Sequence, residues 1–409
     1  LLVVRLDWAG LTLTSGTLAT VAIDKARQLY AEGDAAFSAF GFVAAVAHFT
    51  LEKTTLPGGL TVDGISLANA EGLRFALTDA SAFVGLDATT VAGGDPGFAG
   101  DTATGTIGLA ASVASFKLHT ILAPSGIKYM GIEILDLDGG LTGIDAVDFD
   151  VADVTVRVNR AANLLGVAVT PRLNWSAAAL APTGFGLGST AAEELYAAGS
   201  ASVNLFDLVT GSADFELVKQ DVDVDLGAET LTGAGLLLFG LSDLELAVGV
   251  AGFGVDITGG TVALAILKPA ATAPSPARSW TALQASGIGG TLHLPGVYAG
   301  VENLVVEVNS ASVGATALDW ANALDVDRDG TFGDDAQVVG VTFSLAGERL
   351  RVAGELVDLD VFGLLTGEAG FELVRDTVDA DVNDDGTLDL DDASLLTFAI
   401  GLDEAPGPE

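Results

Sequence analysis

The sequence contains no cysteine, one methionine, three histidines and only 17 lysines and arginines among its 409 residues. Without cysteine the chain cannot form a disulfide framework, a zinc knuckle or a thiol nucleophile. The few basic residues stand against 55 aspartates and glutamates, which gives a formal net charge of −38. A charge of this sign argues against nucleic acid and anionic membranes as electrostatic partners, and it favours cations.

Half of the residues are hydrophobic and the mean hydropathy is +0.51, so the chain is too apolar for a disordered acidic tail. A large core is therefore expected. The longest apolar run, residues 231–255, contains Asp243 and Glu245. Each charge costs about 2.5–3.5 kcal/mol at a bilayer centre, so we expect no transmembrane segment. The chain starts inside a strand-like run, "LLVVRLDW", without a cleavage signal, and we expect a segment of a longer protein.

Internal repetition organises the chain. Segments 29–53, 195–219 and 350–375 align almost without gaps, and each has a tryptophan upstream. Matching strand-like stretches, "VTVRVNRA" and "LVVEVNSA", precede the second and third tryptophans. The corresponding residues are Gly33, Gly199 and Gly354; Phe40, Phe206 and Phe362; Phe49, Phe215 and Phe371; Lys53, Lys219 and Arg375; and Trp8, Trp175 and Trp320. We interpret the tryptophans as core or junction residues, with sugar stacking as the alternative.

The copies are offset by roughly 155 residues, which is enough for a module with its own core. We expect a partial module at 1–105 and two further modules at 106–260 and 261–409.

Alternation of apolar and polar residues, as in "VTVRVN" and "LVVEVN", is typical of strands, and turns such as "LPGG" and "ITGG" separate the strands. The predicted fold is all-β, with sandwich- or roll-like modules that abut into an elongated stalk or fibre. Residues 19–33 have helical propensity, but their end is expected to be strand because the partner copies alternate. Residues 389–402 are ambiguous between strand and helix.

An acidic loop near the end of the chain, "DVNDDGTLDLDD", has the spacing of a calcium-binding loop. Positions 1, 3, 5, 7, 9 and 12 are occupied by Asp381, Asn383, Asp385, Thr387, Asp389 and Asp392, and Gly386 takes the tight-turn position. This spacing matches the EF-hand pattern with aspartate in place of the terminal glutamate.

A second loop, "DVDRDGTFGDDA", repeats the spacing with Asp325, Asp327, Asp329 and Thr331. Its twelfth residue is Ala336, so Asp334 or Asp335 would have to supply the last carboxylate. A weaker third candidate is the alternating run at Asp223 and Asp225, for which a solvated strand face is the alternative. Oxygen ligands without histidine or cysteine favour Ca²⁺ over transition metals. The alternative for every loop is a solvated acidic turn.

Catalytic motifs are missing: no GxSxG, phosphate loop, GxGxxG or HExxH occurs. His48, His119 and His293 lie far apart in the sequence, and we interpret them as packed or surface residues. The chain is not expected to be an enzyme, and no catalytic or cofactor-binding residue is predicted.

Loop 381–392 resembles one half-repeat of a dockerin, and the repeat pattern as a whole is similar to tandem-repeat regions of giant secreted or surface-anchored bacterial proteins, such as adhesins and matrix or filament proteins. The resemblance implies an extracellular or cell-surface location and a stalk or filament that calcium stiffens, and we expect self-association with neighbouring repeats or chains. The second hypothesis is an open β groove that carries lipid.

Overall fold

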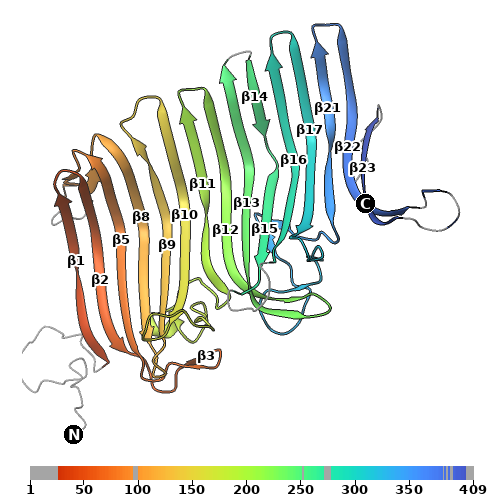
Figure 1. The fold of residues 1–409 in the computed structure, drawn as a ribbon. Coiled ribbons are helices and arrows are strands. Elements are labelled where there is room, and N and C mark those ends of the chain that lie inside the picture. The colour runs from red at the N-terminus through yellow and green to blue at the C-terminus, as the bar shows by residue number, and fades with distance from the viewer. Residues whose placement is uncertain are drawn as a thin grey trace, which may run out of the picture. The chain divides into compact units, whose positions relative to one another are not determined.

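The computed structural model describes residues 26–94, 100–250, 253–270, 278–380, 382–383, 386 and 390–401. These residues form β-strands joined by turns and loops, with a single turn of 3₁₀ helix, η1 (Ala181–Thr183) (Figure 1). The all-β prediction is therefore confirmed. The end of the helix-prone segment 19–33 is strand from Arg27 onwards, and the ambiguous segment near residue 390 is also strand.

The chain forms two compact units: unit 1 comprises residues 1–143 and 152–195, and unit 2 comprises residues 144–151 and 196–409. The three-module division stays a prediction. It is based on the offset between repeats, whereas the two units are defined by the compactness of the folded chain. Two strands, β10 (Val147–Ala162) and β11 (Glu193–Leu205), have residues in both units. Among the described residues, no helix is long and apolar enough to cross a membrane.

Unit 1 contains an antiparallel sheet in which strands that follow one another along the chain are paired. Its order is β1 (Arg27–Ala39), β2 (Val43–Thr55), β5 (Glu71–Leu86), β8 (Ile107–Leu122) and β9 (Lys128–Thr142). Two small hairpins lie in its connections, and they are formed by β3 (Thr61–Val62) with β4 (Ile65–Ser66) and by β6 (Thr89–Val91) with β7 (Thr102–Thr104).

Unit 2 contains a second antiparallel arrangement. It begins with β12 (Val209–Asp225) and β13 (Thr230–Val250); β13 then pairs with both β14 (Phe253–Thr258) and β15 (Thr261–Lys268), which both pair with β16 (Trp280–Leu294). The order continues through β17 (Val297–Ala311), β21 (Arg349–Val361), β22 (Leu365–Ala380) and β23 (Leu390–Gly401). Short strands in the loops are β18 (Leu324–Asp325), β19 (Gln337–Val338) and β20 (Val341–Thr342).

The aligned segments have the same strand register. In β2–β5, β12–β13 and β22–β23 the facing pairs are Leu51 with Phe75, Leu217 with Phe239, and Leu373 with Phe398. A shift of one residue would move every side chain to the opposite face of the sheet, so an unchanged register keeps the apolar face the same in each copy.

The hairpin that opens each copy also turns in the same way. Phe40, Phe206 and Phe362 adopt φ values of 57°, 57° and 55° at the turns that follow β1, β11 and β21. A bulky residue in this left-handed region is uncommon and costs free energy. The turns of the second and third copies are tied to a neighbouring turn, because the Phe206 N–H donates to Ala146 O and the Phe362 N–H donates to Gly296 O.

Each unit packs a loop segment over one face of its sheet. In unit 2 the segment is residues 312–348, which we name cover 2. Alternate residues of the strands, such as Ala234, Leu236 and Leu238, share a core with apolar residues of cover 2. In unit 1 the segment is residues 163–192, named cover 1, which packs with strand ends and with residues 56–70. The layer over this part of each sheet therefore consists of loops with a few short strands and one 3₁₀ turn.

A buried asparagine ties each cover to its sheet. In unit 2, Asn309 on β17 accepts a 3.0 Å hydrogen bond from the Trp320 indole Nε1 and donates to Leu318 O and Gly347 O at 2.8 and 2.7 Å. Both side chains have no exposed surface. The contacts join a strand to two distant points of cover 2.

Unit 1 repeats this arrangement atom for atom. Asn159 on β10 accepts a 3.0 Å hydrogen bond from the Trp175 indole Nε1. It donates hydrogen bonds to Leu173 O and Thr190 O at 2.8 and 2.7 Å. Trp175 and Trp320 are completely buried, as expected of core residues. Trp8, the third tryptophan of the alignment, lies outside the described residues.

Replacing Asn309 with alanine leaves the buried Trp320 N–H and the carbonyls of Leu318 and Gly347 without this partner. Each such group costs about 1–3 kcal/mol, so we expect the free energy of unfolding of unit 2 to fall by about 3 kcal/mol or more. Urea denaturation followed by tryptophan fluorescence measures this change. The control is Asn322→Ala, which removes an exposed asparagine of the same cover and is expected to have a much smaller effect. Equal stabilities of the two variants would contradict a structural role for the tie.

Candidate metal centre

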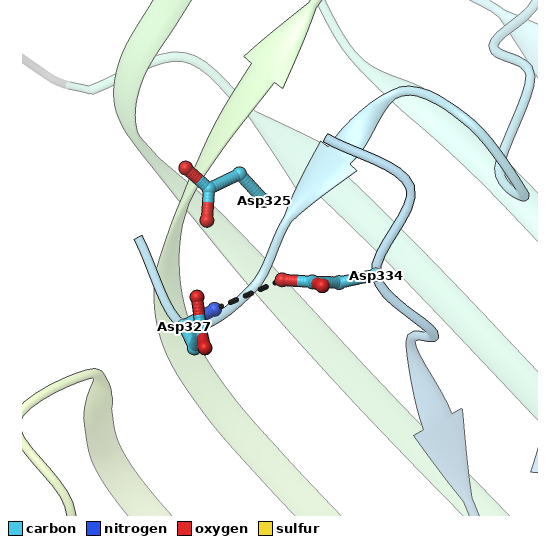
Figure 2. Close-up of side chains that lie close together, drawn as sticks. All are labelled: Asp325, Asp327 and Asp334. Atoms are coloured by element: carbon cyan, nitrogen blue, oxygen red, sulfur yellow. Dashed lines mark hydrogen bonds between the residues drawn. The ribbon is translucent and has the colours of Figure 1, made fainter. Parts of the chain in front are cut away.

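Cover 2 brings three carboxylates together. One oxygen each of Asp325, Asp327 and Asp334 lies within 4.8 Å of the other two, and Figure 2 shows the three side chains around one turn of the chain. Their positions follow from the local fold. β18 pairs with β12 so that Asp325 faces Asp223, while Leu324 is buried in the core beneath. Asp325 is itself only 1% exposed.

Backbone N–H groups hold the first carboxylate in place. The Asp329 N–H donates to Asp325 Oδ1 at 3.0 Å and the Gly330 N–H donates to Oδ2 at 2.9 Å. Gly330 has φ of 93°, a backbone conformation that side chains with a Cβ rarely adopt. The glycine that the sequence pattern assigns to the tight turn therefore lets the chain reverse beside Asp325.

The chain then returns to close the loop. The Gly333 and Asp334 N–H groups both donate to Leu324 O, at 2.8 and 3.0 Å. This return places Asp334 Oδ2 within 2.8 Å of the Val326 N–H and 3.3 Å of the Asp327 N–H, the second of which is drawn in Figure 2. The closing carboxylate is therefore position 10 of the loop.

The structure brings together two of the five residues predicted for this loop, and the prediction that they bind a metal stays a prediction. Asp325 and Asp327 belong to the group, and the open choice between Asp334 and Asp335 falls to Asp334. Ala336, at the twelfth position, is buried in the core, which explains why that position carries no ligand. Asp329 lies next to the group and accepts from the Thr331 N–H at 2.7 Å; Thr331 and Asp335 are exposed.

The third candidate loop lies beside the second, but its carboxylates accept hydrogen bonds from other groups of the chain. Asp223 accepts from the Gly233 N–H at 2.7 Å and from Arg328 Nε at 3.2 Å, and Asp225 accepts from the Gly227 N–H at 2.7 Å. Asp223 faces Asp325 through the β12–β18 pairing, a proximity that the sequence did not reveal. Its carboxylate is already balanced by the Arg328 guanidinium.

Loop 381–392 falls mostly outside the described residues. This applies to Asp381, Asp385, Thr387 and Asp389 and to the side chain of Asp392, while Asn383 is described and exposed. The prediction of a calcium site there stays a prediction.

The electrostatics of Asp325, Asp327 and Asp334 favour a cation. Two unit charges 4.8 Å apart repel by about 3–4 kcal/mol at an effective dielectric of 20. A divalent ion between the carboxylates reverses the sign of that interaction. The arrangement can therefore hold a metal ion through oxygen ligands.

A polar cleft of about 800 Å³ lies in unit 1, between the sheet and cover 1. Its charged groups are paired: Glu52 accepts from Arg27 Nε at 3.0 Å and also pairs with Arg74, and Glu133 pairs with Lys117 at 2.9 Å. Glu133 additionally accepts from the Gly188 N–H at 2.6 Å. Each ion pair links neighbouring strands, and Glu133 also links the sheet to cover 1.

The three histidines lie in different surroundings. His119 is buried in the same cleft, where desolvation lowers its pKa to about 4 although its Nδ1 lies 3.2 Å from Phe185 O. His48 is half-exposed, and its hydrogen bond to Asp34 at 2.8 Å raises its pKa. His293 packs against the Tyr298 ring, with 4.7 Å between ring centres. These packed and surface positions agree with the interpretation from sequence.

Comparison of the chain with protein-family models, with curated proteins and with solved structures found no match.

Replacing Asp325 with alanine removes the acceptor for two backbone N–H groups, Asp329 and Gly330. Hydrogen bonds to charged groups contribute about 1.5–3 kcal/mol each, so we expect unit 2 to lose about 2–4 kcal/mol even when a chelator is present. Chemical denaturation in chelator measures this loss. Asp335→Ala is the matched control and is expected to change stability by less than about 0.5 kcal/mol, because the side chain is exposed. An unchanged free energy of unfolding in Asp325→Ala would show that the carboxylate does not organise the loop.

Proposed function

We propose that this chain is a structural segment of an extracellular or cell-surface bacterial protein, in which all-β units are stabilised by Ca²⁺ and associate with neighbouring repeats to form a stalk or filament. The observation that carries the proposal is the arrangement of Asp325, Asp327 and Asp334 within one cover loop. The loop belongs to the layer over the sheet, so a bound ion would stabilise the fold itself.

Calcium is the proposed ion because of the ligand chemistry and the loop sequence. Carboxylate oxygens suit hard cations, and the alternating aspartates followed by glycine have the spacing of calcium loops. Asp327 is exposed and Asp334 is half-buried, so the group is accessible to an ion from solvent.

The duplicated structural ties support a scaffold role. Asn159 with Trp175 and Asn309 with Trp320 make the same three hydrogen bonds, and three strand pairs keep one register. Repeating units that preserve their internal packing are typical of proteins that extend a structure by adding modules. The net charge of −38 supports association through cations and argues against nucleic acid as a partner.

The lipid-carrying alternative has weaker support. The cleft in unit 1 is lined by Arg27, Glu52, Arg74, Lys117 and Glu133. Paired charges suit water and polar groups better than acyl chains.

Thermal unfolding in calcium and in chelator tests the proposal. An ion that binds only the folded state contributes about 2.7 kcal/mol at a concentration 100 times its Kd. This corresponds to a rise in Tm of about 5–10 °C for a unit of roughly 200 residues. We expect this rise in millimolar calcium and a much smaller rise in magnesium.

The double variant Asp327→Asn and Asp334→Asn separates this site from loop 381–392. The variant should lose part of the calcium-dependent rise, whereas Asp335→Asn should keep it. Identical Tm values in calcium and chelator for the unaltered chain would contradict the proposed role of calcium.

A further inference from the structure

The last strand of unit 2, β23, is exposed in a way that its counterparts are not. Phe398 is 65% exposed and Ile400 is 67% exposed, and Leu395 and Leu396 are also exposed. Leu395 and Leu396 are adjacent, so they point to opposite faces of the sheet. β23 therefore presents apolar side chains on both faces.

The repeat register identifies the counterparts of these residues in β13. Leu373 faces Phe398 as Leu217 faces Phe239, so Leu395 corresponds to Leu236 and Ile400 to Leu241. Leu236 is completely buried, and Leu237 and Leu241 are partly buried. Equivalent positions of one strand type therefore differ in exposure: Leu236 shares a core with residues of cover 2, whereas Leu395 is 45% exposed.

The counterparts of β23 also have a strand paired to their outer edge. The outer edge of β13 pairs with β15, where Phe239 faces Leu264, and the outer edge of β5 pairs with β8, where Phe75 faces Leu118. In the described part of the chain, β23 pairs with β22, and Figure 1 shows it as the final strand, in dark blue, beside β22. The strand type that β23 represents thus takes an antiparallel neighbour in both other copies.

We propose that the outer edge of β23 docks an antiparallel β-strand of the β8 and β15 type, supplied by a further copy of this repeat. The inference deepens the proposed structural role and rests on it for the identity of the partner. Main-chain hydrogen bonds along the edge provide affinity, and alternate side chains provide the register.

The register of docking follows from the internal copies. Leu77 faces Phe116 and Phe75 faces Leu118 in the β5–β8 pair. By the same offset, Ile400 faces the equivalent of Phe116 and Phe398 faces the equivalent of Leu118. Pairing of this kind places apolar groups of both strands side by side, which stabilises cross-strand contacts. An uncovered apolar edge is otherwise an aggregation hazard, which gives the docking a physical benefit.

A synthetic peptide with the sequence of residues 105–124, which includes β8, is the probe. Amides of β23 that point away from β22 should exchange their hydrogens quickly in the free chain. We expect the peptide to slow exchange in residues 394–400 by at least about tenfold, because unpaired edge amides become hydrogen-bonded. Hydrogen exchange with mass spectrometry measures the change, and β16 and β17 serve as internal references. A peptide with proline at the positions of Val113 and Leu118 is the inactive control.

Substitutions in the protein test the assigned edge. Phe398→Asp should abolish the protection, and the fold should survive because the side chain is exposed. Phe253→Asp, an exposed phenylalanine at the β13–β14 turn, is the matched control and should leave protection unchanged. Protection that persists in Phe398→Asp would overturn the inference.

Two other results would also overturn it. One is the absence of protection by the peptide at saturating concentration. The other is concentration-dependent protection of β23 without peptide, together with a dimer in sedimentation, because the occupant would then be a second β23. Parallel measurements in calcium and chelator separate this inference from the proposed function. A calcium-dependent Tm without peptide protection would remove the docking inference and leave the structural role. Peptide protection without a calcium-dependent Tm would remove the role of calcium and leave the docking inference.

Discussion

The buried asparagine beside each tryptophan is the contact on which the covered sheet depends. Asn309 and Asn159 each use both amide N–H groups and the amide oxygen, so neither leaves a buried polar atom unpaired. A fully satisfied buried polar group fixes geometry without the cost of an unpaired one. The two donated bonds reach both ends of the cover, and the accepted bond orients an indole that fills the core. Burial of a tryptophan side chain contributes about 4–6 kcal/mol at the usual area coefficient.

The candidate metal centre depends on the same cover. Leu324 packs in the core that Trp320 completes, and the next residue is the buried Asp325. Ala336 and Val338 return the chain to this core on the other side of the loop. The loop is therefore anchored at both ends before any ion binds, and its carboxylates are held in position by backbone N–H groups. Such pre-organisation lowers the conformational entropy that binding would otherwise cost.

The sequence predicted the strand class, and it placed Asp325 and Asp327 in one acidic loop, because these features depend on local alternation and spacing. It did not predict the partner of each tryptophan. Asn159 and Asn309 stand in strand-like stretches that the alignment matched, yet an asparagine in a strand has many possible partners and only the folded cover selects one.

The third loop carboxylate was left open for a similar reason. Asp334 and Asp335 are adjacent, and the choice between them depends on hydrogen bonds to Leu324 O and on the burial of Ala336. The left-handed Phe40, Phe206 and Phe362 contradict the usual preference of phenylalanine, so propensity gave no indication of these turns.

Exchange of the indole N–H protons of Trp175 and Trp320 is the most direct test of the claim that the ties hold the covers on the sheets. Nuclear magnetic resonance with labelled tryptophan follows these two protons separately from the sheet amides. The account predicts that both exchange as slowly as the slowest amides of their own unit, because they are released only when the unit unfolds. Exchange of either indole much faster than the strand amides would show that the cover opens locally, and it would contradict the central place given to the ties.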